Sequence, residues 1–311
     1  MKSKITEMKI QVATSQFPVS SDIKQNCEYI IAQTRMAKEN DCNLIHFPEG
    51  SLSGYAGVDF ESFEDYNWEL LKESTKKIIE VAGNLGIWIL LGSSHKLSEQ
   101  NKPHNSLYII NDKGELVDRY DKLFCAGDDT NETGDLKHYS SGNHFTTFNI
   151  NGVKCGVLIC HDYRYPELYR ELKKQGVQLM FHSYHAGNMN TERQKMMEDQ
   201  IGKEFEELNF GKTYPEITMP ATMVSYASNN YVWISCANTS AKESCWASFM
   251  VRPDGVIIGR LKKNKDGILI TEVNTQTEYY DSTKYWRSRA MEGIFYSGNK
   301  VSDERSENRT E

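Results

Sequence analysis

Three side chains with the chemistry of acyl transfer each follow a predicted strand in this sequence: a cysteine, a glutamate and a lysine. Cys160 comes directly after the apolar run 153–159 and shortly before Pro166, a residue typical of the first turn of a helix. A thiol at a strand end is held on a rigid base, near backbone N–H groups that can receive a developing oxyanion. A lone cysteine is more often a half-buried structural residue, so its companions decide the interpretation.

Glu49 and Lys122 occupy similar positions elsewhere in the chain. Glu49 follows the short apolar run 44–47, and Lys122 follows the second strand of a hairpin whose turn is 112–114. Taken singly, the first would be a solvated turn residue and the second a surface lysine. Together with Cys160 they supply a base, an oxyanion stabiliser and a nucleophile, which are the parts needed for acyl transfer.

The segments around these residues resemble three motifs of the nitrilase or carbon-nitrogen hydrolase superfamily, in its amidase-like branch. FPEG with Glu49, YDK with Lys122 and LICHDYRYPE with Cys160 are similar to the family's glutamate, lysine and cysteine motifs, in the same order. The similarity extends from MKIQVATSQF near the start, through 227–238, to RPDGVIIGRL at 252–261. The ordered set is more specific than any one motif.

This resemblance implies a mechanism. Glu49 takes the thiol proton, Cys160 attacks a carbonyl carbon, and Lys122 with the backbone N–H of His161 stabilises the tetrahedral oxyanion. Ammonia or an amine leaves, and water activated by Glu49 then hydrolyses the thioester. Candidates for the wall of the substrate pocket are Tyr55, Tyr163, Tyr184 and His185.

Many members of the family carry a second acidic residue between the lysine and the cysteine. Alignment on the segment HYSSG at 138–142 assigns that position to Asp135, whereas keeping the residue type would choose Glu132. Both remain candidates for a supporting acid beside Lys122.

The cysteine motif, of the form C-x-D-x-R-x-P-E, resembles those of amidases and N-carbamoyl hydrolases more than those of true nitrilases. We therefore expect hydrolysis of a non-peptide C–N bond in a small amide or N-carbamoyl compound. Nitrile hydrolysis and acyl transfer to an amine are the alternative reactions. A scaffold or binding protein that retains the fold is the non-enzymatic alternative, and the presence of all three reactive residue types counts against it.

Composition disfavours several partners. The 311 residues carry a formal net charge of -7, so no basic field is available for a phosphate backbone, and no glycine-rich phosphate loop is present. We expect no nucleic-acid partner and no cofactor. The histidines are scattered, and His161, His182 and His185 lack the spacing of a zinc site, so no metal is expected.

The cysteines and the apolar segments indicate where the protein resides. Seven cysteines without regular spacing argue against a disulfide framework and for a reducing compartment, with the cytoplasm as the default. The N-terminal segment MKSKITEMKI lacks the apolar core of a secretory signal, and no apolar run is long enough to span a bilayer. We expect a soluble protein that does not enter a membrane.

Strands alternating with helices predict an α/β fold of two sheets packed face to face, with helices outside. Strands are expected at 9–13, 44–47, 87–91, 107–111, 116–120, 144–150, 153–159, 179–183, 232–236, 249–252, 256–260 and 268–273, and helices at 23–38, 69–85 and 166–175. The family resemblance implies the same four-layer αββα sandwich.

We expect a single carbon-nitrogen hydrolase domain over 1–297 and a polar, disordered tail over 298–311. The aromatic stretch 279–296 precedes that tail. In this family the corresponding segment often crosses a dimer interface, so the resemblance implies a homodimer or higher homo-oligomer.

An acidic excursion at 187–217 departs from the family's commoner pattern. Its start, 191–194, has the form of a capping box, and Met197, Ile201, Phe205 and Leu208 recur at helical spacing. This pattern predicts one amphipathic helix, which the family's fold would place near the mouth of the active site.

Overall fold

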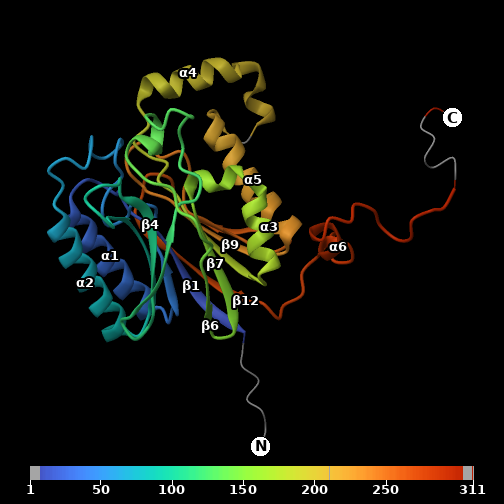
Figure 1. Cartoon of the computed structure of the whole chain (residues 1–311), viewed down its shortest axis with the longest axis horizontal. Helices are drawn as coiled ribbons and strands as arrows, with labels where there is room; N and C mark the ends of the chain where they lie inside the picture. Colours follow the sequence, from blue (N-terminus) through green and yellow to red (C-terminus); the bar gives the residue numbers. More distant parts are fainter. Residues whose placement is uncertain (1–7, 210, 304–309, 311) are drawn as a thin grey trace, which may run out of the picture.

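Two six-stranded sheets pack face to face in the computed structural model, which describes residues 8–209, 211–303 and 310. Helices α1 and α2 cover the outer face of one sheet, and α3 and α5 cover the outer face of the other (Figure 1). The arrangement is the predicted four-layer αββα sandwich.

The first sheet has the strand order β12-β1-β2-β3-β4-β5. Its central strands β1, β2 and β3 are parallel, and the remaining pairs are antiparallel. The bounds are β1 Lys9–Gln16, β2 Leu44–His46, β3 Trp88–His95, β4 His104–Ile110, β5 Leu116–Asp121 and β12 Gly267–Asn274.

The second sheet has the order β11-β10-β9-β8-β7-β6, with β7, β8 and β9 parallel. The carboxyl ends of these three strands therefore meet at one edge. The bounds are β6 Thr147–Ile150, β7 Val153–Ile159, β8 Leu179–Ser183, β9 Trp233–Ala237, β10 Phe249–Val251 and β11 Ile257–Arg260.

The helices begin at residues suited to the purpose. Asp22 caps the first helix by accepting from two backbone N–H groups, and Pro166 occupies the first turn of another, as predicted. The bounds are α1 Ile23–Glu39, α2 Trp68–Leu85, α3 Pro166–Lys174, α4 Thr191–Ile201, α5 Tyr214–Asn230 and α6 Arg287–Met291, with 3₁₀ turns η1 Gly134–Lys137, η2 Cys160–Arg164 and η3 Lys203–Leu208.

The excursion differs from the single helix that the sequence predicts. Helix α4 ends at Gly202, whose φ of +88° suits glycine and interrupts the helix before η3 begins. Asn190, not Thr191, caps α4, because its side chain accepts from the N–H of Arg193. The predicted range 187–217 also runs into α5, a helix that the sequence analysis did not anticipate.

Two hydrophobic clusters hold the layers together. One fills the space between the sheets and extends under α3 and α5, and the other lies between the first sheet and α1 with α2. Polar groups that cross between the sheets are paired: His46 Nδ1 lies 2.9 Å from Ser235 Oγ, and its Nε2 lies 2.9 Å from Ser183 Oγ.

The C-terminal segment beyond β12 leaves the sandwich and extends away from it through α6 (Figure 1). Several aromatic side chains there are exposed, among them Tyr280, Tyr285 and Phe295. Half of the predicted disordered tail, at 304–309 and 311, lies outside the described residues. In the described part of the chain, no helix is both long and apolar enough to cross a membrane.

Candidate active site

Cys160 is the first residue beyond β7 and begins the turn η2. Its φ of +41° lies in the left-handed region, which costs a non-glycine residue on the order of 1 kcal/mol or more. Asp162 braces the turn from within, since its Oδ2 accepts from Ile159 N at 2.9 Å and its Oδ1 accepts from Phe124 N at 2.8 Å. The hydroxyl of Tyr120 also donates to Oδ2, at 2.8 Å. The thiol is thus presented on a turn that surrounding groups hold.

Glu49 lies in the loop after β2, and its side chain is 0% exposed. Its Oε1 accepts from Lys122 Nζ at 2.9 Å and from Asn105 Nδ2 at 2.7 Å. Within residues 8–209, 211–303 and 310, no hydrogen-bond partner is found for Oε2. One oxygen of the carboxylate is therefore held in place while the other is free to accept a proton.

Lys122 follows β5 and joins two carboxylates. Its ammonium also lies 2.6 Å from Asp135 Oδ2, and it sits 5.8 Å from the centroid of the Tyr55 ring. Burial alone would lower the pKa of this lysine, but the charge of Glu49, followed by Tyr55 and Asp135, outweighs burial and raises the pKa well above its usual value. The ammonium form is stable in the site.

Of the two candidate supporting acids, the structure brings Asp135 to Lys122. Asp135 lies in η1, is 5% exposed, and accepts hydrogen bonds from Ala126 N at 2.9 Å and from the hydroxyl of Tyr55. Burial works against its charge, but the charge and hydrogen bond of Lys122 hold its pKa below the usual value. Glu132 is exposed in the preceding loop.

The Cys160 thiol is electrostatically part of this cluster. Burial raises its pKa well above the usual value, the charge of Glu49 raises it further, and the charge of Lys122 opposes both. The thiol is therefore protonated at rest, and a reaction at sulfur requires a base that removes the proton.

The four candidate pocket residues divide into two pairs. Tyr55 stacks on His185 with ring centroids 5.1 Å apart, and both line a cavity of about 600 Å³ that also reaches Asp135. Tyr163 and Tyr184 pack edge to face in the core cluster, and neither lines that cavity in the described structure.

His185 is paired with an acid that sequence inspection missed. Its Nε2 lies 2.9 Å from Asp59 Oδ2, and although burial lowers the pKa of His185, the hydrogen bond and charge of Asp59 raise it overall. Asp59 and His185 are far apart in sequence, so no local pattern pointed to the pair. Asn105 was also missed, because it lies between His104 and Ser106 in the polar first part of β4, before the apolar residues of that strand.

Residues of the excursion complete the rim of the cavity. Asn190 and Arg193 of the α4 segment and Pro215 at the start of α5 line it, together with Lys137 at the end of η1 and His138, which follows it. The predicted position of the excursion, beside the site, agrees with this geometry.

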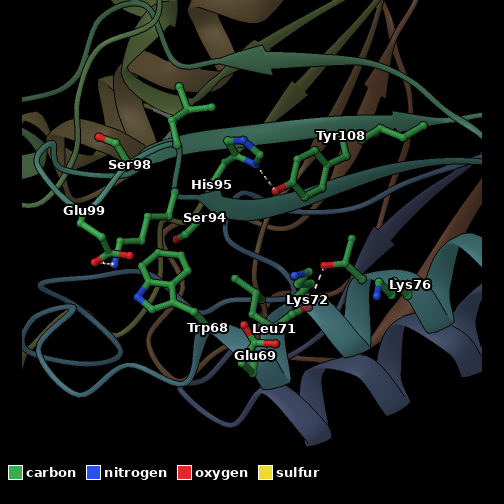
Figure 2. A pocket seen from close by; sticks show the side chains of 14 residues that line it. Trp68, Glu69, Leu71, Lys72, Lys76, Ser94, His95, Ser98, Glu99 and Tyr108 are labelled. Carbon is green, nitrogen blue, oxygen red and sulfur yellow. Dashed lines mark hydrogen bonds and ion pairs between the residues drawn. The ribbon is translucent and has the colours of Figure 1, made fainter.

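A second cavity, of about 450 Å³, lies away from this cluster, between α2 and the strands β3 and β4. Figure 2 shows Trp68 and Lys72 on one side and the pair His95–Tyr108, joined by a 2.7 Å hydrogen bond, on the other. Glu49, Lys122 and Cys160 line neither cavity, but the first cavity is bordered by Asp135, the partner of Lys122, whereas the second is not. Among the residues that the structure describes, no group of three or more His, Cys, Asp or Glu side chains is arranged to hold a metal ion.

Comparison with known proteins places this geometry in context. The family model described as "Carbon-nitrogen hydrolase" matches residues 11–280. Nitrilase homolog 2 of Dictyostelium discoideum is 29% identical over 163 residues, which cover 51% of this chain and 49% of that protein. Omega-amidase NIT2 of Mus musculus is 30% identical over 175 residues, which cover 55% of this chain and 61% of that protein. The chain thus spans about half to three fifths of these relatives' length.

Among solved structures, an amidase from Nesterenkonia sp. superposes with a TM-score of 0.70 over 91% of this chain and 95% of that chain, at 17% sequence identity. At that identity, the likeness concerns the fold. Members of the nitrilase superfamily are among these structural neighbours, so the predicted fold class is confirmed.

Proposed function

The chain belongs to the carbon-nitrogen hydrolase family, and we propose that it hydrolyses the C–N bond of a small amide or N-carbamoyl compound through a thioester on Cys160. The observation that carries this proposal is the convergence of Glu49, Lys122 and Cys160, which come from three strand ends, in one buried cluster. A buried ammonium between two carboxylates contributes little to the stability of a fold, because all three charges must lose their hydration. Its position beside a thiol is typical of a catalytic site.

The proposed reaction begins with transfer of the thiol proton to Glu49, whose Oε2 is free to receive it. The Cys160 sulfur forms a bond to the carbonyl carbon, and the resulting oxyanion is stabilised by Lys122 and the N–H of His161. The C–N bond then breaks, and the leaving nitrogen takes the proton from Glu49. Water then attacks the thioester carbon while Glu49 takes its proton, the C–S bond breaks, the acid leaves, and the sulfur takes the proton back from Glu49.

The relatives support an amide as the substrate. One of the matched proteins is described as an omega-amidase, and the matched crystal structure is that of an amidase. These descriptions agree with the preference for amides and N-carbamoyl compounds over nitriles that the cysteine motif indicates.

The cavity suggests that the acyl group carries a negative charge. Arg193 and Lys137 line it, and neither forms an ion pair in the part of the chain that the structure describes. Among the described residues that line the cavity, Asp135 is the one acidic side chain, and it is already paired with Lys122. The unpaired cations at the rim favour an amide whose acyl group also carries a carboxylate, as in the monoamide of a dicarboxylic acid.

The test is a screen of ammonia release from small amides and N-carbamoyl amino acids, with intact-protein mass spectrometry for an acyl adduct on Cys160. The screen compares monoamides of dicarboxylic acids with neutral amides of equal length. Arg193→Gln should lower kcat/KM for the charged amides by about 10-fold or more and leave the neutral ones unchanged, as expected on losing a hydrogen bond to a charged group. Lys195→Gln is the matched control, because it makes the same charge change on α4 outside the cavity. No ammonia release and no adduct from any substrate would reject the proposal.

The proposed assembly is a homodimer formed through the C-terminal segment. Tyr285 and Phe295 are 82% and 86% exposed, and exposed aromatic side chains on an extended segment are suited to packing against a second copy. We also propose a cytoplasmic location, which is supported by the seven cysteines, all within the described residues and all free. Sedimentation of the full chain and of a variant that ends at residue 278 tests the first proposal.

A further inference from the structure

A buried histidine from β8 contacts the backbone of the proposed nucleophile. His182 Nε2 lies 3.0 Å from the carbonyl oxygen of Cys160, and His182 is 0% exposed. The register explains the contact: β7 and β8 are parallel with Leu158 beside His182, so the histidine lies next to the end of the neighbouring strand.

The other nitrogen of this ring meets a tyrosine from α3. Tyr169, which is also 0% exposed, places its hydroxyl 2.5 Å from His182 Nδ1. Helix α3 packs beside α5 on the outer face of the second sheet (Figure 1), and Tyr226 of α5 packs on the Tyr169 ring with centroids 4.2 Å apart. The position of the tyrosine is therefore set by two helices.

These contacts fix the direction of each hydrogen bond. The carbonyl of Cys160 can only accept, so His182 Nε2 carries the hydrogen and donates it. Burial, above all, lowers the pKa of His182 to about 3, so the ring is neutral and Nδ1 bears a lone pair. The Tyr169 hydroxyl supplies the matching donor. One tautomer of His182 satisfies all three groups.

The direction of the Cys160 carbonyl determines that of the next N–H. In a planar trans peptide the C=O of one residue and the N–H of the next point in opposite directions. A carbonyl that is held toward His182 consequently turns the N–H of His161 to the other side of the peptide.

We propose that Tyr169 and His182 are positioning residues that lock the peptide between Cys160 and His161, so that the His161 N–H is aimed at the oxyanion of the substrate. The inference rests on the proposed function, because that N–H matters only if an oxyanion forms. Neither side chain acts as an acid or a base. The left-handed backbone at Cys160 makes such a lock useful, because this conformation is not one that the chain adopts by preference.

The test separates orientation of the peptide from reactivity of the thiol. His182→Leu removes the donor and should lower kcat by about 10- to 100-fold, which is somewhat less than the loss of kcat when an oxyanion donor itself is removed. KM should change by less than about threefold. Alkylation of Cys160 by iodoacetamide occurs at a saturated carbon and develops no oxyanion, so its rate should stay within about twofold of wild type. His182→Gln, which keeps an N–H donor, should recover most of kcat.

Tyr169→Phe gives an independent variant that keeps the ring and deletes only the donor to His182. Tyr169→Phe should also lower kcat. The double variant with His182→Leu should have the same kcat as His182→Leu alone, because both changes break one chain of hydrogen bonds. Tyr226→Phe is the matched control, since it removes a hydroxyl from the same ring cluster but outside that chain. If His182→Leu does not fold, the kcat and the alkylation rate of Tyr169→Phe test the inference instead.

Two results would overturn the inference: full kcat in both His182→Leu and Tyr169→Phe, or a fall in alkylation equal to the fall in turnover. The second would mean that the pair merely supports the local fold. Failure of the proposed function looks different, because the wild-type protein would then release no ammonia from any amide while its thiol still reacted with iodoacetamide.

Discussion

Lys122 Nζ lies 2.6 Å from Asp135 Oδ2, and the two side chains are 1% and 6% exposed. Lys122 follows the edge strand β5 and Asp135 lies in the short turn η1, so their contact joins the two ends of the loop between them. A second carboxylate beside the ammonium balances its charge and fixes its position relative to Glu49. Replacing either acid would leave a buried charge less well compensated.

The first prediction concerns this contact. Asp135→Asn should lower turnover by about 10-fold or more, because the ammonium loses the partner that positions it for the oxyanion. Glu132→Gln should stay near wild type, since Glu132 is exposed and the ion pairs of the Lys122 ammonium in the described structure are with Glu49 and Asp135. Steady-state kinetics on the best substrate of the screen measures both.

The same pair of variants contains its own control, because each replaces one acid by its amide within the same loop. A fall in activity for Glu132→Gln with none for Asp135→Asn would reassign the supporting role. Two silent variants would mean that the enzyme works with Glu49, Lys122 and Cys160 alone.

The second prediction is that Cys160→Ala abolishes turnover while the fold persists. Alanine keeps the backbone of η2 and removes only a half-buried sulfur, so the thermal midpoint should move by less than about 4 °C. No thioester can form, so the adduct seen by mass spectrometry with the wild-type protein should disappear. Turnover at the wild-type rate would refute the mechanism.

Much of the sandwich follows from the sequence because the strands are continuous apolar runs bounded by turns. The run 153–159 and the strand Val153–Ile159 coincide, and the predicted strand 179–183 is also correct. Boundaries were missed where polar residues continue a strand, as in Trp88–His95, which the apolar pattern ended at 91. Those positions contact the loop after β2, since Leu52 N donates to the Gly92 carbonyl and Ser94 Oγ donates to Ser53 Oγ, and the local pattern does not show this contact.

Other features depend on contacts between distant segments. Helix α5 contains Pro220 and lacks a clear amphipathic pattern, yet Met219 and Met223 pack into the core. The partners Asn105, Asp59 and His182 each meet a residue more than 20 positions away. The order of the three motifs predicted which residues converge in the cluster, but only the folded chain shows what holds each of them.

The third prediction concerns pH and stability. Burial lowers the pKa of His182 from 6.5 to about 3, so between those values the unfolded chain binds a proton that the folded protein does not. The free energy of unfolding must then fall as the pH falls through this window, with a contribution of about 1.4 kcal/mol per pH unit from one such group.

Denaturant titrations of wild type and His182→Gln from about pH 8 to about pH 4 measure this contribution. The wild-type curve should be steeper than the variant curve by about that slope below pH 5.5, and the two slopes should agree above pH 7. His46 remains in both proteins, and burial, the larger cause of its lowered pKa, acts in both, whereas the smaller effect of the His182 charge is lost in the variant. Parallel curves throughout would mean that His182 has the same pKa in the folded and the unfolded protein.

The last prediction concerns the excursion. Among the described residues of α4 and η3, only Met197 is buried, whereas α5 contributes Met219 and Met223 to the core. Replacing 191–208 with a short glycine-serine linker should therefore spare the fold and remove Arg193 from the rim of the cavity. We expect the ratio of kcat/KM between charged and neutral amides to fall by about 10-fold or more, as expected for a lost charged contact, while iodoacetamide modifies Cys160 at the wild-type rate. Equal loss of both reactions would show instead that the excursion supports the nucleophile itself.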